Sequence, residues 1–108
     1  MAHLSERTYT DVFGNTVALT DTVRATILTK HPEAAAFIEN VGDVLGDPDE
    51  VRRSVRDERA VLYYRFDADV LRGKWVVVVV KRVDRHFIAT VYATDRIKSG
   101  GVLWRKAR

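Results

Sequence analysis

The neighbouring stretches KWVVVVVKRV (residues 74–83) and HFIATVYAT (residues 86–94) decide the fold of this chain. Both are rich in β-branched and aromatic residues, and each is long enough for a complete strand. Only Asp84 and Arg85 separate them, and so short a connection joins antiparallel neighbours. The sequence therefore predicts a β-hairpin over residues 74–94 within an antiparallel sheet.

Successive side chains of a strand point to opposite faces, so this hairpin sorts its residues into two sets. With Asp84-Arg85 as a two-residue turn, Val79 lies opposite Thr90 and Val77 opposite Tyr92, on the same face as His86. The other set is more apolar and consists of Val76, Val78, Val80, Phe87, Ala89 and Val91. We expect the apolar set to lie beneath helices, with Leu62, Tyr64 and Phe66 beside it.

Two helices are predicted before the sheet. Thr20 or Asp21 can cap the first, which must end near His31 because a residue before proline avoids helical geometry. Pro32 suits the first turn of the second helix, and Gly46 ends it. Residues 9–19 alternate around Gly14-Asn15 and favour a short hairpin or an extended arm.

The expected fold class is therefore α+β, in a single domain that covers residues 1–108. Two N-terminal helices, at about residues 21–45, pack on one face of a four-stranded antiparallel β-meander at about residues 50–95. The four predicted strands are 51–56, 61–66, 74–83 and 86–94. The opposite sheet face is expected to be open.

Composition limits the function classes. The chain has no cysteine, which excludes disulfides, zinc–thiolate sites and a thiol nucleophile. Its longest apolar runs are far below the ~20 residues of a membrane span, and its first residues are polar, so we expect no membrane partner. A cytoplasmic location is the default expectation, with secretion or delivery as a toxin module left open. A net charge of +3 favours an anionic partner only weakly.

The predicted open face gathers basic, hydroxyl and imidazole side chains: Arg52, Arg56, Tyr63, Arg65, Lys81, His86, Thr90, Tyr92 and Thr94. Arginine and lysine neutralise phosphate charge, and histidine transfers protons near neutral pH. RNA carries its own nucleophile, the ribose 2′-hydroxyl, so its cleavage needs only a base, an acid and charge stabilisation. The chain has neither a metal-ligand pattern nor a glycine-rich phosphate loop, and we expect no metal or other cofactor.

The order of several segments resembles a known nuclease group. They are ILTKHPE (27–33), DPDEVRRS (47–54), LYYR (62–65), residues 75–81, and FIATVYATD (87–95) with IKSG (97–100). Over about residues 10–105 the chain is similar to small phage- and mobile-element-associated domains of the barnase/EndoU/colicin/RelE-like (BECR-fold) group. The resemblance implies two helices before a four-stranded antiparallel sheet, and metal-independent RNA cleavage of the kind that toxins perform.

The resemblance also implies roles for individual residues. Either His86 or His31 would be the general acid or base, and Lys81 with Arg52 would stabilise the pentavalent phosphate. No glutamate is predicted beside His86, so an acid–base pair of the barnase kind is not evident. The expected catalytic residues are His86, His31, Lys81, Arg52 and Thr90, and the expected substrate-binding residues are Arg56, Tyr63, Arg65, Tyr92 and Thr94.

The first functional hypothesis is thus a toxin-like endoribonuclease that acts on RNA, with tRNA as one candidate and an antitoxin or immunity protein as a partner. The second is a non-catalytic RNA-binding module, in which arginines contact the backbone and Tyr63, Tyr92 and Trp104 offer stacking surfaces. The third is a protein-interaction domain that docks a partner on its open sheet or edge strand. Ordinary structural roles also remain open, with His86 as a surface residue beside a turn and His31 as a helix cap.

Overall fold

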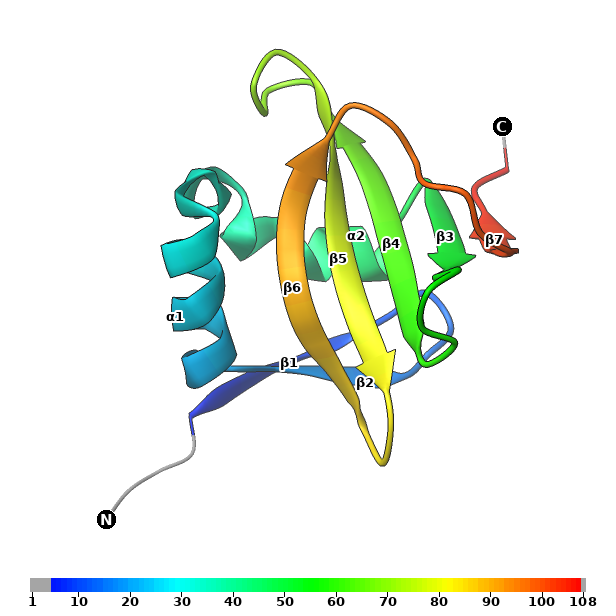
Figure 1. Cartoon of the computed structure of the whole chain (residues 1–108), viewed down its shortest axis with the longest axis horizontal. Coiled ribbons are helices and arrows are strands. Elements are labelled where there is room, and N and C mark those ends of the chain that lie inside the picture. The colour runs from blue at the N-terminus through cyan, green and yellow to red at the C-terminus, as the bar shows by residue number, and fades with distance from the viewer. Residues whose placement is uncertain (1–4, 108) are drawn as a thin grey trace.

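A computed structural model describes residues 5–107 as an α+β fold with one seven-stranded mixed sheet and two short helices (Figure 1). The strands are β1 (Glu6–Thr10), β2 (Thr16–Thr20), β3 (Glu50–Arg53), β4 (Ala60–Asp67), β5 (Lys74–Arg82), β6 (His86–Thr94) and β7 (Val102–Arg105). The helices are α1 (Asp21–Lys30) and α2 (Val41–Gly46), with the 3-10 turns η1 (Pro32–Ala36) and η2 (Ile38–Asn40) between them. The strand order across the sheet is β1-β2-β6-β5-β4-β3-β7.

The predicted four-stranded antiparallel meander is wrong, because three further strands extend it on both sides. Strands β3 to β6 do pair antiparallel in chain order. The β1–β2 hairpin joins β6 through a parallel pairing of Val17 with His86 and Ala18 with Phe87. On the other side β7 pairs antiparallel with β3. The β1–β2 hairpin is one of the two alternatives that the alternation around Gly14-Asn15 favoured, but its place in the sheet was not predicted. Strand β7 has only four residues, which is too short for a clear alternation of apolar and polar positions.

The predicted second helix is also wrong as a continuous element. Residues 32–40 form two 3-10 turns that break at Phe37, whose φ is −139°, and α2 has only six residues. The stretch FIENVGDVLG (residues 37–46) contains β-branched residues, Asn, Asp and glycines, which are weak helix formers. The first helix behaves as expected: the Thr20 hydroxyl caps it by accepting from the Val23 N–H, and it ends before Pro32.

The register of the central hairpin changes part of the way along it. Val79 pairs with Thr90 and Val77 with Tyr92, as predicted, but the register then shifts and Val80 pairs with Ile88. The shift is a β-bulge, in which β6 has one extra residue, Ala89. From Ile88 back to His86, the side chains of β6 therefore point to the opposite face from the one that simple alternation predicts. Arg82 consequently pairs with His86, so the turn spans residues 83–85 instead of two residues.

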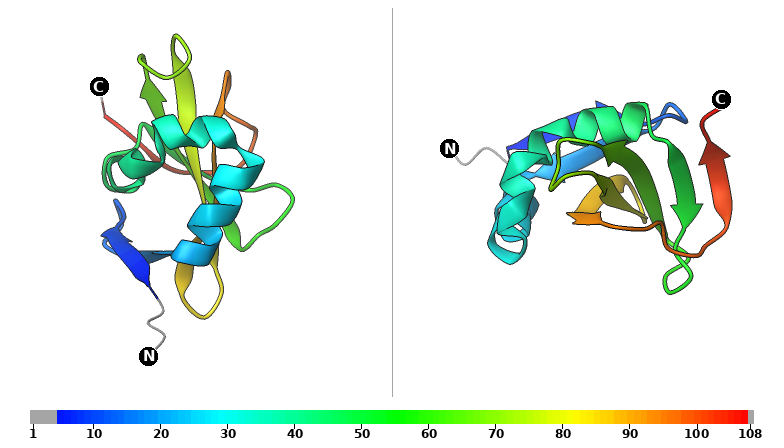
Figure 2. Two further views of the ribbon diagram at one scale, coloured as in Figure 1. Left: turned by 90° about the vertical axis from the view of Figure 1, so that its left-hand side faces the viewer. Right: turned by 90° about the horizontal axis from the view of Figure 1, so that it is seen from above.

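Two apolar clusters lie on opposite faces of the sheet. The larger one is covered by the helical segments and the β1–β2 hairpin, which Figure 2 shows on one side of the curved sheet. The smaller one consists of Leu62, Tyr64 and Val77, with partly buried neighbours that include Trp75, Val79, Tyr92 and Ile97. Tyr63 belongs to the larger cluster, which inverts the predicted faces of β4, since a shift of one residue exchanges them. Among residues 5–107, no helix combines the length and the apolar character that a membrane span requires.

Candidate functional site

A cleft lies on the open face of the sheet, beside the smaller apolar cluster. Its lining comes from the β3–β4 loop (residues 54–59), from β3 to β6 and from the 95–101 segment. Figure 1 shows the path of this segment from β6 toward β7. The volume of the cleft is about 400 Å³, within the usual size of small-molecule sites. The lining residues are Arg52, Arg53, Ser54, Val55, Arg56, Ala60, Leu62, Tyr64, Val79, Thr90, Tyr92, Lys98 and Ser99. We call this site the basic cleft.

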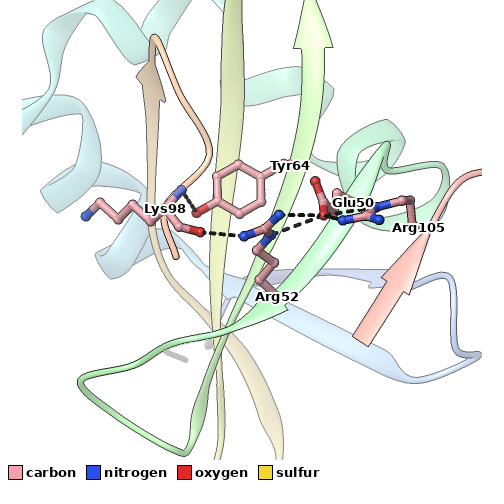
Figure 3. Close-up of polar contacts among 5 residues, drawn as sticks. All are labelled: Glu50, Arg52, Tyr64, Lys98 and Arg105. Atoms are coloured by element: carbon pink, nitrogen blue, oxygen red, sulfur yellow. Dashed lines mark hydrogen bonds and ion pairs between the residues drawn. The ribbon is translucent and has the colours of Figure 1, made fainter. Parts of the chain in front are cut away.

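Three hydrogen bonds hold the 95–101 segment against the sheet. The Arg52 Nη1 donates to the Lys98 carbonyl at 3.3 Å, and the Lys98 N–H donates to the Tyr64 hydroxyl at 3.2 Å (Figure 3). The Arg53 N–H donates to the Gly101 carbonyl at 2.8 Å. A Cβ at Gly100 would overlap the Arg53 carbonyl, so this close backbone approach requires glycine. The 95–101 segment, which forms one wall of the basic cleft, is therefore held through its own backbone groups.

The guanidinium of Arg52 also contacts Glu50, which is almost fully buried and lies between Arg52 and Arg105 (Figure 3). One carboxylate oxygen of Glu50 accepts from Arg52 Nη2 at 2.9 Å and from Arg105 Nη2 at 2.7 Å. Burial alone would raise the pKa of Glu50, but the hydrogen bonds from Arg105 and Arg52 outweigh it and leave this pKa below its usual range. Glu50 is shared by two arginines and compensates the charge of Arg52 only in part. Arg52 anchors the cleft wall through the Lys98 carbonyl, and Glu50 connects it to Arg105 of the edge strand β7.

Arg53, Arg56 and Lys98 differ from Arg52 because they are exposed and form no ion pair with any of the described residues. The Lys98 ammonium lies 5.5 Å from the centre of the Tyr92 ring, a cation–π arrangement. No aspartate or glutamate lines the basic cleft. An anion entering it therefore meets uncompensated positive charge above an apolar floor.

The structure brings four of the ten predicted site residues into this cleft: Arg52, Arg56, Thr90 and Tyr92. Lys81 and Arg65 lie outside it, and each is paired with a carboxylate. Lys81 Nζ is 3.2 Å from Asp57, and Arg65 Nη1 is 2.8 Å from Asp47. Thr94 lies opposite Trp75 at the end of β6 and does not line the cleft.

His86 and Tyr63 lie on the covered face, away from the basic cleft. The Tyr63 hydroxyl donates to the buried carboxylate of Asp11 and accepts a long hydrogen bond, 3.4 Å, from Arg82. Burial, and then the Asp11 carboxylate, raise the pKa of Tyr63, which keeps it protonated. His86 Nδ1 and Arg82 Nε are buried without a partner among the described residues. The expected catalytic position of His86 on the open face is therefore wrong, because the β-bulge reverses the face of this end of β6.

His31 lies nearer to the basic cleft than His86. Its ring centre is 6.3 Å from that of Tyr92, and its Nδ1 is 3.4 Å from the Glu33 carboxylate. It follows α1 directly and is the C-cap residue of that helix, so part of its position has a structural explanation. It does not line the cleft itself.

The sequence reasoning did not identify Arg53, Tyr64, Lys98 and Ser99 as cleft residues. Tyr64 was missed because the faces of β4 were inverted. The available signal for Lys98 and Ser99 was the glycine pair 100–101 before VLWR, which is typical of a close backbone approach.

The chain matches no known protein family, no curated protein and no solved structure. Its resemblance to the nuclease group therefore stays a prediction. The geometry of the basic cleft is the basis for a functional assignment.

Proposed function

We propose that this protein binds RNA through the basic cleft without cleaving it. The observation that carries the proposal is the set of three exposed cations, Arg53, Arg56 and Lys98, which have no carboxylate partner among residues 5–107 and border a cleft that no acidic residue lines. Phosphate groups are suitable ligands for such cations, and contacts to the phosphates supply a large share of the affinity of nucleic-acid-binding surfaces.

The floor of the cleft favours a nucleic acid over a simple inorganic anion. Leu62, Val79 and the ring of Tyr92 are apolar and aromatic groups that a sulfate or phosphate ion alone would leave unused. Bases pack on aromatic side chains, and hydroxyls such as those of Thr90 and Ser99 can bond to ribose or base edges. RNA provides both the charge and the flat apolar groups.

The binding function is favoured over cleavage by the positions of the predicted catalytic groups. His86 is on the other face of the sheet, Lys81 is paired with Asp57, and Arg52 is paired with Glu50. A metal-independent endoribonuclease remains the second candidate because His31 lies 6.3 Å, ring centre to ring centre, from Tyr92 at the cleft.

Salt-dependent binding tests the first candidate. Fluorescence anisotropy with a labelled single-stranded RNA is measured from low to moderate salt for the wild type and for the triple variant Arg53→Gln, Arg56→Gln, Lys98→Gln. Because each lost phosphate contact removes about 0.7 from the slope of log K against log salt, the triple variant should have a slope shallower by about 2. The matched control is Arg7→Gln, Arg24→Gln, Arg85→Gln, which removes the same charge from arginines that pair with Glu39 and Glu6.

We expect the control variant to keep the wild-type slope. Equal slopes for the two triple variants, or no binding by the wild type at low salt, would contradict the proposal and leave a protein partner as the better candidate. The second candidate is tested by incubating labelled total RNA and tRNA with the protein in EDTA. Fragments that end in a cyclic phosphate, and that disappear with His31→Ala but persist with His86→Ala, would favour cleavage over simple binding.

A further inference from the structure

The floor of the basic cleft contains an aromatic ring, that of Tyr92, beside the exposed side chain of Lys98. Tyr92 is half-buried, and the ammonium group of Lys98 lies 5.5 Å from the centre of its ring. Lys98 is exposed, and its long side chain is free to rotate away from the ring. A flat ligand group can therefore replace the ammonium on Tyr92, and the freed ammonium can then bind a neighbouring phosphate.

The hydroxyl groups of Tyr64 and Thr90 differ in whether a ligand can reach them. Tyr64 is fully buried, and its hydroxyl accepts from the Lys98 N–H, so it supports the floor from beneath and does not face a ligand. Thr90, whose hydroxyl can bond to the edge of a base, lines the cleft itself. It lies at the apolar floor, whereas Arg53 and Arg56 come from the end of β3 and the loop that follows it. The arrangement separates a site for an uncharged group from a site for negative charge.

We infer that the basic cleft holds one unstacked base of a single-stranded RNA against Tyr92, while Arg53, Arg56 and Lys98 contact the flanking phosphates. This inference rests on the proposed RNA-binding function and names the RNA class. A cleft of about 400 Å³ has room for a nucleoside but not for a duplex. In a duplex the bases are stacked on one another, so a double helix would engage the cations and leave the floor empty.

Three RNA probes of the same length separate these possibilities in the wild-type protein. They are a 12-nucleotide single strand, the same strand annealed to its complement, and a 12-unit ribose-phosphate strand without bases. Anisotropy at one fixed salt concentration should show the single strand binding at least about tenfold more tightly than either of the others, because a stacked base adds that much affinity.

Variants at Tyr92 then test the ring itself. Tyr92→Ala should weaken single-strand binding about tenfold and leave abasic binding unchanged, and Tyr92→Phe should retain wild-type binding. The matched control is Phe13→Ala, a partly exposed aromatic residue that packs against Tyr63 and Arg82 away from the cleft. It should bind all three probes as the wild type does. Thermal melting checks that each variant is folded.

The three-probe comparison needs no variant, so it remains decisive if Tyr92→Ala does not fold. Equal affinity for the single strand and the abasic strand, or for the single strand and the duplex, would overturn the inference while leaving RNA binding intact. Failure of all three probes to bind would overturn the proposed function itself.

Discussion

The two faces of the sheet use neighbouring tyrosines in opposite ways. Tyr63 and Tyr64 are adjacent in β4, and both are fully buried. On the covered face, the Tyr63 hydroxyl donates to Asp11, whose carboxylate also accepts from the backbone of the β1–β2 turn. On the open face, the Tyr64 hydroxyl accepts from the Lys98 N–H and holds the wall of the basic cleft. One face therefore uses its polar groups to stabilise the fold, and the other uses them to shape a site.

The two faces should differ most in how much stability a tyrosine hydroxyl contributes, which the matched variants Tyr63→Phe and Tyr64→Phe measure as a loss in the free energy of unfolding. Tyr63→Phe removes a donor from the buried Asp11 carboxylate and should cost up to about 3 kcal/mol, as for hydrogen bonds to charged groups. Tyr64→Phe removes a neutral acceptor and should cost about 1 kcal/mol. Urea denaturation at neutral pH measures both values. Equal losses would mean that the two hydroxyls do not differ in this way.

A smaller effect is expected where the 95–101 segment crosses β3. Gly100→Ala places a Cβ onto the Arg53 carbonyl, and relieving that overlap should cost about 2 kcal/mol. Because the displaced segment carries Lys98, RNA binding should also weaken. Gly101→Ala is the matched control, since its Cβ would have no atom within 4 Å. If Gly100→Ala melts and binds as Gly101→Ala does, the wall of the cleft does not depend on this contact.

The sequence predicted which residues share a strand better than it predicted which way they face. Alternation correctly paired Val79 with Thr90 and Val77 with Tyr92. It failed at His86, because the β-bulge lies in β6 at Ala89, between these pairs and the turn, and its sequence there gives no signal of a bulge. It also inverted Tyr63 and Tyr64, since two aromatic residues in succession fit either face equally well.

The sequence predicted part of the candidate site: three strand residues, and Arg56, which lies in the β3–β4 loop instead of the strand predicted over residues 51–56. Arg52, Thr90 and Tyr92 are strand residues, and all three line the cleft. Lys98 and Ser99 reach it from an irregular segment whose path depends on backbone hydrogen bonds to β3 and β4, and residue periodicity carries no information about such contacts. The sequence favoured a hairpin or an extended arm around Gly14-Asn15, and the hairpin is present as β1–β2. Its parallel pairing with β6 and the strand β7 were missed for a related reason, because both depend on distant partners.

A still smaller effect is expected for the pH dependence of the stability that Glu50 contributes. Ion pairing keeps the pKa of Glu50 lower in the folded state than in the unfolded chain, where a glutamate has a pKa of about 4.3. Its stabilising contribution is present above that value and is lost as the pH falls through the folded-state pKa. Glu50→Gln should therefore lose less stability than the wild type between pH 6 and pH 3, by about 1 kcal/mol.

Urea denaturation at these two pH values measures this difference. Other carboxylates with lowered pKa values, among them Asp47 and Asp57, contribute equally to both proteins. Glu58→Gln is the control, since Glu58 is exposed and has no ion pair among the described residues, and it should respond to acid as the wild type does. If Glu50→Gln and the wild type lose the same stability between these two pH values, the ion pairs of Glu50 do not stabilise the folded state.

The smallest effect on stability is expected from the open-face cations themselves. Arg53→Gln, Arg56→Gln and Lys98→Gln should each change the free energy of unfolding by less than about 0.5 kcal/mol, because these exposed groups have no ion-pair partner within residues 5–107. Arg65→Gln is the contrast: its guanidinium bonds to the side chain and the carbonyl of Asp47, and its loss should cost about 1 kcal/mol. RNA affinity should show the reverse order, with the three cleft variants weakened and Arg65→Gln unchanged. If a cleft variant instead melts earlier than Arg65→Gln and binds RNA normally, its charge serves the fold, and the distinction between the two faces fails at that residue.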